Sequence, residues 1–351
     1  MLMKNEISII TPHSVYNYGA MLQAYGIYQF IKKNGYDVGV YEFPVDKEKI
    51  RSIKGFIYTV IEKFFRMIHY SELKEGDHAF DDFILRYQIN KDDQSKVYIV
   101  GSDQVWNPNN INPHFSLKKF TNTYKFSYAA SLGVSEISAG QKGKYDFLKD
   151  MKQISVREKT AVNILENMFG CKAEVNIDPS FLLEDEEWRK IEKKPQGIPE
   201  EYILVYILHI PNNINEVLNE LKKKLNKKIV LIDRRGYLNK IVHCDNVVRN
   251  AGPSEFLWLI DHAQFIVTSS FHGTAFSLIF QKPFCSLVNP NAPSRINDLL
   301  KLMEIKKREN ERDELTMEID YEKVKAVIKN EREKSYRYIV ENLKEAGING
   351  N

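Results

Sequence analysis

The chain alternates short apolar segments with amphipathic ones, and this alternation constrains its possible folds more than any other feature. Ile7–Ile10 is apolar and predicts a strand, and Ala20–Lys33 has the residue spacing of an amphipathic helix. Asn34-Gly35 ends that helix, because glycine accepts the left-handed conformation that often follows one. Asp37–Phe43 predicts the next strand. Strands joined by a helix are parallel, so we expect an open α/β sheet with ligands beyond the carboxyl ends of its strands.

The same pattern divides the chain into two halves. Polar sequence at 184–199 is the expected linker, and 351 residues fit two domains. We expect two α/β domains facing a cleft, at 1–184 and 200–315, and a last helix within 316–351 that packs across the surface. Further strands are predicted over Val97–Val100, Lys125–Ala130, Ile154–Val156, Val175–Ile177, Tyr202–Leu208, Lys228–Ile232, Asn246–Val248, Phe265–Thr268 and Phe284–Val288. Further helices are predicted over Glu158–Met168, Ile214–Leu225, Ser254–His262, Gly273–Phe280, Arg295–Met303 and Tyr321–Leu343.

Charge and cysteine usage exclude several classes of protein. Lys+Arg 50 against Asp+Glu 47 is too balanced to indicate a nucleic-acid-binding protein. Cys171, Cys244 and Cys285 are widely spaced and form no CxxC pair, so we expect neither a disulfide framework nor a zinc site. There is no HExxH or DxD arrangement, and we predict that no metal is required. No apolar run is long enough for a signal peptide or a membrane span, so a cytoplasmic protein is expected.

One segment departs from the α/β pattern. Ile50–Tyr70 is rich in aromatic residues and carries the cations Arg51, Lys54, Lys63 and Arg66. Such a helix either contacts a membrane or a lipid-linked ligand at the inner face of the membrane, or packs its apolar side on its own domain. Both interpretations remain open at the level of sequence.

The most specific local signal follows the predicted strand Phe265–Thr268. Gly273 and Thr274 would open the next helix, whose free N–H groups favour an anion. His272 would then be a general acid or base, or a phosphate ligand, with Ser269 and Ser270 beside it. The alternative is a histidine that is hydrogen bonded for structural reasons.

Arginines follow two other predicted strands. Arg157 precedes Glu158 at the end of a strand in the first half, and Arg234-Arg235 follow a strand in the second half. The planar guanidinium group suits a carboxylate or a phosphate. A surface ion pair between Arg157 and Glu158 is the competing interpretation.

Several segments, taken together, resemble the polysaccharide pyruvyl transferase family from about residue 7 to residue 305. The segments that carry the resemblance are Tyr16–Ala20, Leu22–Ala24, Gly101–Pro108, Ser127–Gly133, Ile154–Glu158, Asp178–Ser180, Ser270–Thr274 and Ser294–Ile296. The resemblance implies two Rossmann-like domains of the GT-B type. It also implies transfer of a pyruvyl group from phosphoenolpyruvate to two hydroxyls of one sugar of a surface polysaccharide, such as an exopolysaccharide or capsule, or of its lipid-linked precursor. The product would be a pyruvate ketal, and no cofactor would take part.

The resemblance also implies roles for individual residues. His272, Arg157 and Asp103 match the family's catalytic positions, with Asp103 near the acceptor. The first domain would form the acceptor side and the second the donor side. The implied donor-binding residues are Arg157, Arg234, Arg235, Ser269, Ser270, His272, Gly273, Thr274 and Arg295. The implied acceptor-binding residues are Asn17, Tyr18, Gly19, Ser102, Asp103, Gln104 and Trp106.

The chain departs from the family pattern at one position. Family members tend to carry arginine two residues before the histidine, where this chain has Ser270. Arg234, Arg235 or Arg295 would have to supply the missing charge. Two other functions therefore stand beside pyruvyl transfer: a GT-B glycosyltransferase that uses a nucleotide sugar, and a catalytically inactive module that binds a saccharide or a lipid carrier. Because Arg157 and His272 come from different halves, we also expect the halves to move relative to one another.

Overall fold

The first five strands form one parallel sheet. The computed structural model describes residues 5–43, 56–91, 94–288, 294–305 and 318–350. The strands of the first sheet lie in the order β3-β2-β1-β4-β5. They are β1 (Ile7–Ile10), β2 (Val38–Tyr41), β3 (Ile89–Asn90), β4 (Val97–Val100) and β5 (Tyr124–Ser127), and every pairing is parallel. A two-stranded parallel sheet of β6 (Ser155–Val156) and β7 (Glu174–Val175) follows, and an isolated bridge from Ala130 to Val156 links it to the first sheet.

The second sheet repeats this topology. Its strands are β8 (Tyr202–Tyr206), β9 (Lys228–Ile232), β10 (Asn246–Val248), β11 (Phe265–Thr268) and β12 (Phe284–Ser286), in the order β10-β9-β8-β11-β12. All four pairings are parallel. The strand order reverses between β1 and β4 in one sheet and between β8 and β11 in the other. Open α/β sheets bind ligands at such switch points, so the loops after these four strands are the expected location of a site.

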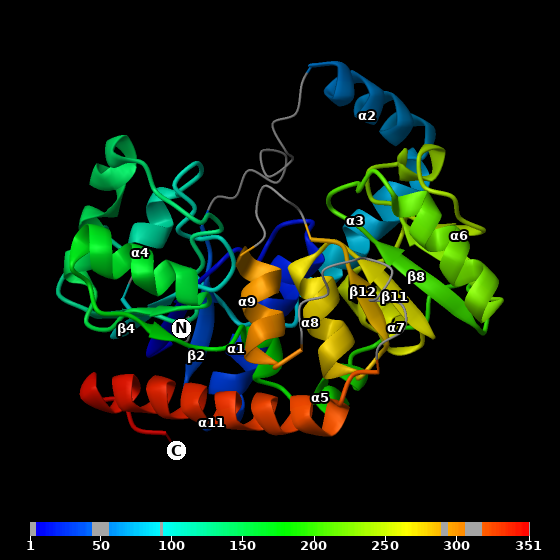
Figure 1. Ribbon diagram of the computed structural model, residues 1–351. Coiled ribbons are helices and arrows are strands. Elements are labelled where there is room, and N and C mark those ends of the chain that lie inside the picture. Colours follow the sequence, from blue (N-terminus) through cyan, green and yellow to red (C-terminus); the bar gives the residue numbers. More distant parts are fainter. Residues whose placement is uncertain (1–4, 44–55, 92–93, 289–293, 306–317, 351) are drawn as a thin grey trace.

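Helices cover both sheets (Figure 1). The α-helices are α1 (Tyr18–Lys33), α2 (Phe56–Ile68), α3 (Tyr70–Ile84), α4 (Lys159–Phe169), α5 (Asp185–Arg189), α6 (Ile214–Leu225), α7 (Pro253–Asp261), α8 (Phe271–Ile279), α9 (Ser294–Leu302) and α11 (Tyr321–Glu345). Short 3-10 segments span Pro113–Ser116, Ala139–Asp150, Pro179–Phe181 and Leu238–Lys240. No described helix combines the length and the hydropathy that a membrane span requires.

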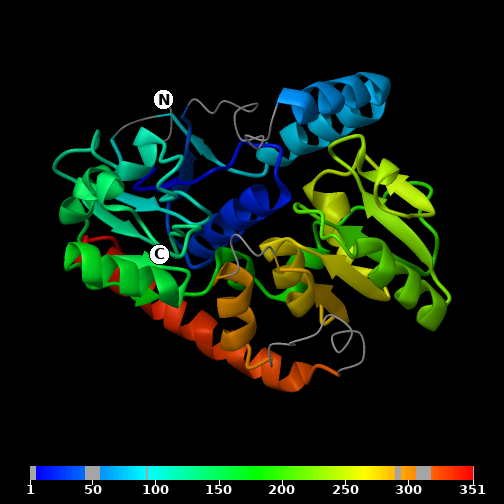
Figure 2. The ribbon, with the colours of Figure 1, turned by 45° about the horizontal axis from the view of Figure 1, so that its top comes forward.

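Two helical elements cross between the halves. Helix α3 belongs to the first half in sequence, but Asp77 on it pairs with Arg234 of the second half, and Glu72 pairs with Arg249 at 3.1 Å. Helix α11 begins beside the second half and runs along the first sheet (Figures 1 and 2), where the Tyr338 hydroxyl donates to the Ser127 carbonyl. The two five-stranded sheets fall within 1–184 and 200–315, while these helices tie the halves together.

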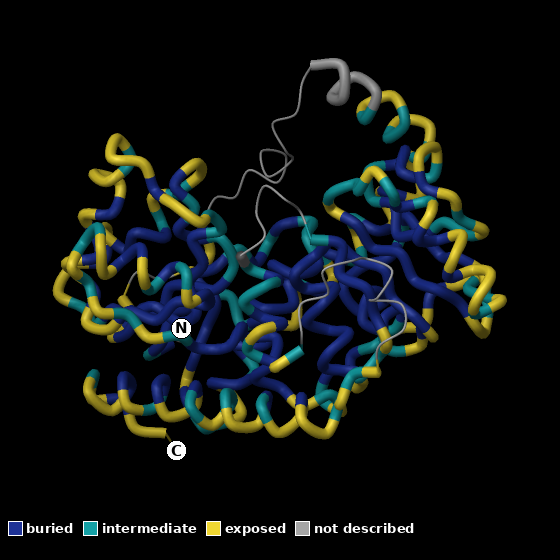
Figure 3. Tube along the Cα trace, viewed as in Figure 1, coloured by how far each residue is buried: buried dark blue, intermediate teal, exposed yellow. Residues whose placement is uncertain are grey.

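The apolar core is continuous across the boundary between the halves. Tyr18 of α1 stacks on Phe256 of α7 with ring centroids 4.4 Å apart, and its hydroxyl donates to the Ala251 carbonyl at 2.8 Å. Figure 3 shows buried segments running from one sheet to the other. Domains move freely by default unless their interface is large and apolar. Relative motion of the halves would have to break these contacts, and it remains a prediction.

Some predicted boundaries need correction. The segment predicted as a linker, 184–199, contains α5, which begins where Glu187 bonds back to the Glu184 backbone N–H at 2.9 Å. Helix α8 begins at Phe271 and not at Gly273, because the Ser270 side chain caps it by accepting from the Gly273 N–H. The boundary predicted at residue 315 lies outside the described residues, as do residues 50–55 of the aromatic segment.

Candidate active site

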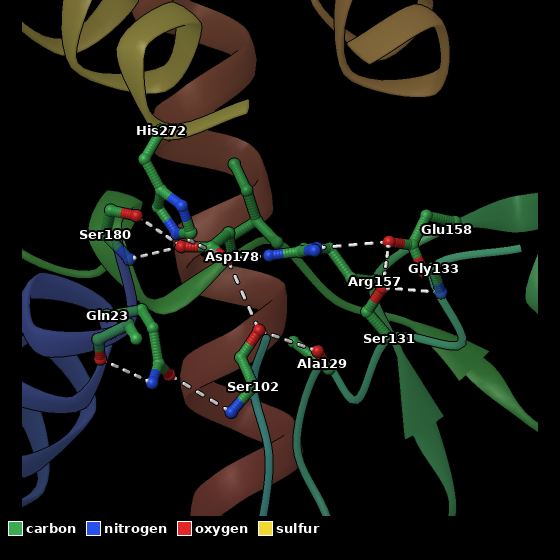
Figure 4. A network of polar contacts seen from close by, with 12 residues as sticks. Gln23, Ser102, Ala129, Ser131, Gly133, Arg157, Glu158, Asp178, Ser180 and His272 are labelled. Carbon is green, nitrogen blue, oxygen red and sulfur yellow. Dashed lines mark hydrogen bonds and ion pairs between the residues drawn. The ribbon is translucent and has the colours of Figure 1, made fainter. Parts of the chain in front are cut away.

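Asp178 lies at the centre of a buried polar network between the halves (Figure 4). It follows β7, and its Oδ1 accepts from the Ser180 N–H at 2.9 Å, which begins the Pro179–Phe181 turn. Its Oδ2 accepts from Arg157 Nη1 at 2.6 Å and from Ser102 Oγ at 3.3 Å. One carboxylate thereby joins three loops of the first half that are distant in sequence.

The Asp178 carboxyl is held ionised. Burial by itself would raise its pKa, since a charge is costly in a dry interior. The neighbouring His272 and Arg157, together with the Ser180 hydroxyl, outweigh burial and hold the pKa of Asp178 well below its usual range. A fixed negative charge therefore faces His272 at neutral pH.

Arg157 connects this carboxylate to the second half. Its Nε lies 3.2 Å from Glu158 Oε1, and its Nη2 is buried without a hydrogen-bond partner among the described residues. The guanidinium carbon lies 4.1 Å from the ring centroid of Phe271. Burial would lower the pKa of Arg157, but Glu158 and Asp178 raise it above its usual value. The predicted pair with Glu158 exists, and it is buried rather than on the surface.

His272 reaches this network from the second half. It lies in the first turn of α8, and its Nε2 is 3.7 Å from Asp178 Oδ2, without a hydrogen bond. The other ring nitrogen faces α1, because a Cβ placed on Gly19 would come within 1.9 Å of Nδ1. Only glycine at position 19 leaves room for this imidazole. Gly19 therefore allows the His272 imidazole to lie directly against the backbone of α1.

A cavity of about 260 Å³ adjoins Arg157, Asp178 and Phe271. Its remaining wall comes from Val175 of β7, Ile177, α9, α11 and the start of α4. The charged residues that line it are the five cations Arg157, Lys159, Arg295, Lys301 and Lys334 and the three carboxylates Asp178, Asp298 and Glu331. An excess of cations in a cavity favours an anionic ligand.

Arg295 is the second cation of this cavity that has an unused buried donor. It lies at the start of α9, and its Nε is buried without a hydrogen-bond partner in the part of the chain that the structure describes. Burial lowers the pKa of Arg295, and the charge of Arg157 lowers it further. Two arginines that repel one another and keep unused donors are suited to hold an anion between them.

Arg234 and Arg235 have other partners. Arg234 donates to the Arg249 carbonyl at 2.6 Å and to the Leu73 carbonyl at 3.1 Å, and it pairs with Asp77. Arg235 donates to the Leu208 carbonyl. Neither lines the cavity. Of the three cations that could replace the family's missing arginine, only Arg295 does.

The serine and threonine residues around His272 are engaged internally. Ser269 donates to the His209 carbonyl at 2.9 Å, and Thr274 donates to the Ser270 carbonyl at 3.1 Å. Ser270 caps α8, as described above. A Cβ on Gly273 would come within 2.2 Å of Thr268 Oγ1, so close packing explains this glycine. Their side chains build the turn that carries His272.

The predicted acceptor residues divide into buried and accessible groups. Tyr18, Ser102 and Trp106 are almost fully enclosed, and Trp106 Nε1 donates to the Phe115 carbonyl. Asn17 caps α1 by accepting from the Ala20 N–H at 3.1 Å, and Gln104 accepts from Asn107 Nδ2 at 2.9 Å.

Asp103 differs from the other predicted acceptor residues in that its side chain has no hydrogen-bond partner among the described residues. It is half-buried, with φ 61. Its charge acts on Arg157 and Arg295, so it lies close to the cavity.

Sequence reasoning did not identify several residues of the cavity wall. Asp178 stands in a polar cluster directly after a predicted strand, and this position indicates a site residue in an α/β domain. Lys334 and Glu331 reach the cavity on α11, more than 150 residues beyond Asp178, and no local pattern connects them.

One group of residues elsewhere has the spacing of metal ligands. Glu192, Asp261 and His262 are the members of the group found among the described residues. Both Asp261 oxygens already accept from Arg189, at 2.8 and 3.2 Å, which disfavours a second cation there. The prediction that no metal is required remains a prediction.

Comparisons with known proteins agree with the resemblance seen in the sequence. The family model described as polysaccharide pyruvyl transferase matches residues 17–291, which confirms that resemblance. No curated protein matches the chain.

The fold resembles solved structures of low sequence identity. UDP-GlcNAc 2-epimerase from Methanocaldococcus jannaschii has a TM-score of 0.51 at 12% identity, over 92% of this chain and 91% of that one. The complex of a Methanocaldococcus jannaschii UDP-GlcNAc 2-epimerase with UDP-GlcNAc and UDP has a TM-score of 0.50 at 16% identity, over 97% and 99%. S. aureus MnaA with UDP has a TM-score of 0.51 at 12% identity, over 94% and 89%. At such identity the likeness concerns the fold alone, and it confirms the predicted GT-B-like architecture.

Proposed function

The chain belongs to the polysaccharide pyruvyl transferase family, and from this premise we propose that it moves a pyruvyl group from phosphoenolpyruvate to one sugar of a surface polysaccharide or of its lipid-linked precursor. The product is a pyruvate ketal on two hydroxyls of that sugar. The observation that carries the proposal is a pair of unpartnered buried donor atoms in the cavity wall, Arg157 Nη2 and Arg295 Nε. His272 does not line the cavity itself, but its Nε2, also without a hydrogen bond, lies 3.7 Å from Oδ2 of the lining residue Asp178.

Unpartnered buried donors are expensive. Each costs on the order of 1–3 kcal/mol when nothing accepts from it, and native proteins keep few of them. Phosphoenolpyruvate carries a carboxylate and a phosphate on the same carbon, C2, so it offers acceptors to several donors at once. Arg157 and Arg295 are suited to hold these two anionic groups, with Lys159, Lys301 and Lys334 adding charge at the cavity wall.

The reaction needs an acid, a base and a place for the leaving phosphate. Protonation of the methylene carbon makes C2 of phosphoenolpyruvate oxocarbenium-like. One sugar hydroxyl then adds to C2, the bond from C2 to the phosphate oxygen breaks, and the second hydroxyl closes the ketal. Of the two hydroxyl protons, one replaces the proton given to the methylene carbon and the other leaves with the phosphate. The atoms balance without a redox cofactor.

The residues of the site can meet these needs. In this proposal His272 gives a proton to the methylene carbon or to the departing phosphate, and ionised Asp178 orients the imidazole and stabilises its charged form. Asp103, with a carboxylate that no described residue engages, takes the proton of a sugar hydroxyl. Helix α8 adds the partial positive charge of its N-terminus near the phosphate.

The proposal is tested by phosphate release from phosphoenolpyruvate with a panel of glycosides, followed by mass spectrometry of each glycoside. Release that depends on one glycoside, with the mass of a pyruvate ketal added to it, is the expected result. A nucleotide sugar consumed in place of phosphoenolpyruvate would instead indicate a glycosyltransferase. Ligand binding without turnover would indicate an inactive saccharide-binding module.

A further inference from the structure

The end of α2 and the first residue of α3 expose an unusual concentration of large apolar side chains. Phe64, Met67, Ile68 and Tyr70 are 54%, 69%, 53% and 62% exposed, and we call these four the α2 tip. Among the described residues, the other exposed large apolar side chains are Leu85, Leu208, Ile241 and Tyr336, scattered along the chain. Single exposed apolar residues are ordinary, but a contiguous group marks an interaction surface.

The opposite side of α2 is anchored to the second half. Phe65 packs against the apolar cluster beneath the second sheet, and Arg66 Nη1 donates to the Arg234 carbonyl at 3.1 Å. The helix therefore already has an inner contact face, and the α2 tip points away from it. Among the described side chains of this segment, Phe65 does pack against the chain, but on the second half and not on the segment's own domain.

Charges around the α2 tip favour an anionic surface. Lys63 and Lys74 are exposed, and Lys74 lies 5.7 Å from the ring centroid of Tyr70. Two of the nearby carboxylates are held by the second half, since Glu72 pairs with Arg249 and Glu75 accepts from Asn250 at 3.0 Å. Glu62 on α2 is the remaining one, and it is half-buried. Large apolar side chains beside exposed lysines are typical of segments that lie in the headgroup region of anionic membranes.

The shape of the region favours lipid over a second copy of the chain. Figures 1 and 2 show α2 at the periphery, beside α3 and away from both sheets. A stable dimer needs about 800 Å² from each partner, or roughly 20–30 residues a side, which four side chains on a peripheral helix do not provide. Insertion into lipid needs only a few such side chains.

We infer that the α2 tip docks the protein on an anionic membrane surface, with Phe64, Met67, Ile68 and Tyr70 in the lipid and Lys63 and Lys74 at the headgroups. This contact would hold the protein where a lipid-linked saccharide lies. It goes beyond the proposed chemistry and does not depend on it, because membrane binding can be measured without turnover.

Co-sedimentation with lipid vesicles tests the inference. The wild-type protein should bind vesicles of phosphatidylcholine mixed with phosphatidylglycerol and bind phosphatidylcholine alone at least about tenfold more weakly. The triple variant Phe64→Ser/Met67→Ser/Ile68→Ser should lose binding to the mixed vesicles by about tenfold or more. Leu85→Ser/Tyr336→Ser removes exposed apolar side chains elsewhere and should bind like the wild type. Lys63→Gln/Lys74→Gln should weaken binding to the mixed vesicles and leave binding to phosphatidylcholine vesicles unchanged.

Three results would overturn the inference. They are absence of wild-type binding to the mixed vesicles, equal binding by the triple variant, and a wild-type dimer that the triple variant converts to a monomer. The melting temperature of each variant shows that it is folded. Phosphate release with a water-soluble glycoside should not change in the triple variant, so loss of vesicle binding is distinguishable from failure of the proposed reaction.

Discussion

Arg234 and Arg295 are both cations that the sequence predicts at the donor site, and their surroundings are opposite. Arg234 donates to two carbonyls and pairs with Asp77, so its donors hold α3 against the second half. Arg295 lines the cavity with a buried Nε that no described residue engages.

This contrast teaches how a binding cation differs from a structural one. Both arginines stand near polar segments of an α/β domain, so position along the chain does not separate them. What separates them is whether their donors are already satisfied. We therefore expect Arg295 to matter for turnover and Arg234 to matter for stability.

The largest effect is expected at His272, whose Nε2, like Nε of Arg295, is buried without a hydrogen-bond partner among the described residues. His272→Ala should lower turnover with phosphoenolpyruvate by about 10²–10⁴, the usual range for one acid or base group. His262→Ala removes an exposed histidine stacked on Trp258 and serves as the control. Phosphate release and melting temperature measured on the same samples decide the question. A folded His272→Ala protein with nearly normal turnover would remove this residue from the mechanism.

Arg295→Ala is the next largest expected change. Loss of one positioned cation should lower kcat/KM for phosphoenolpyruvate by about 10²–10³. The melting temperature should stay the same or rise, because burial and the neighbouring Arg157 both disfavour the charge that is removed. Arg295→Lys keeps the charge without the planar fork and should recover only part of the activity. A large fall in melting temperature with unchanged kcat/KM would show that Arg295 is structural.

Arg234→Ala should show the reverse pattern. Its carbonyl and Asp77 partners would be left unsatisfied, which we expect to cost about 1–3 kcal/mol in the free energy of unfolding. Turnover of the folded protein should change little. Denaturant unfolding of Arg234→Ala, Asp77→Ala and the double variant measures the coupling between the two residues. Wild-type stability together with lost activity would place Arg234 in the site after all.

Glu192 extends this comparison to a buried polar group outside the cavity, because its Oε1 has no hydrogen-bond partner among the described residues. Burial and the neighbouring Asp261 raise its pKa to about 7, although Arg189 and Lys282 oppose this. The folded-state pKa exceeds that of the unfolded chain, near 4.3, so the contribution of Glu192 to wild-type stability falls as pH rises from about 4 to 7.

Glu192→Gln should remove this pH dependence and stabilise the protein at pH 8 by up to about 3 kcal/mol, without effect on turnover. Melting curves between pH 4 and 8 provide the measurement. Parallel pH profiles for the wild type and the variant would refute the raised pKa.

The strands could be predicted closely from the sequence because they are buried on both sides. Ile7–Ile10, Val97–Val100 and Phe265–Thr268 have the predicted bounds, since parallel strands under two layers read as uninterrupted apolar runs. Helix α3 was not predicted. Its residues are mostly polar, and the ion pairs that anchor it join it to the second half, 150 or more residues away along the chain.

The site could be predicted only as a set of candidates. His272 and Arg157 each follow a predicted strand, and the end of a strand can be recognised in the sequence. The choice among Arg234, Arg235 and Arg295 depends on Asp77 and on the Leu73, Leu208 and Arg249 carbonyls, partners that only the folded chain brings together.

The central claim is that the cavity between Arg157 and Arg295 holds phosphoenolpyruvate for reaction at His272. The most direct measurement is the release of inorganic phosphate from phosphoenolpyruvate, with the glycoside panel, by the wild type, Arg295→Ala and Arg234→Ala side by side. We predict glycoside-dependent release by the wild type, near-normal release by folded Arg234→Ala, and loss of about 10²–10³ in kcat/KM for Arg295→Ala. Equal release by the wild type and Arg295→Ala would contradict the account.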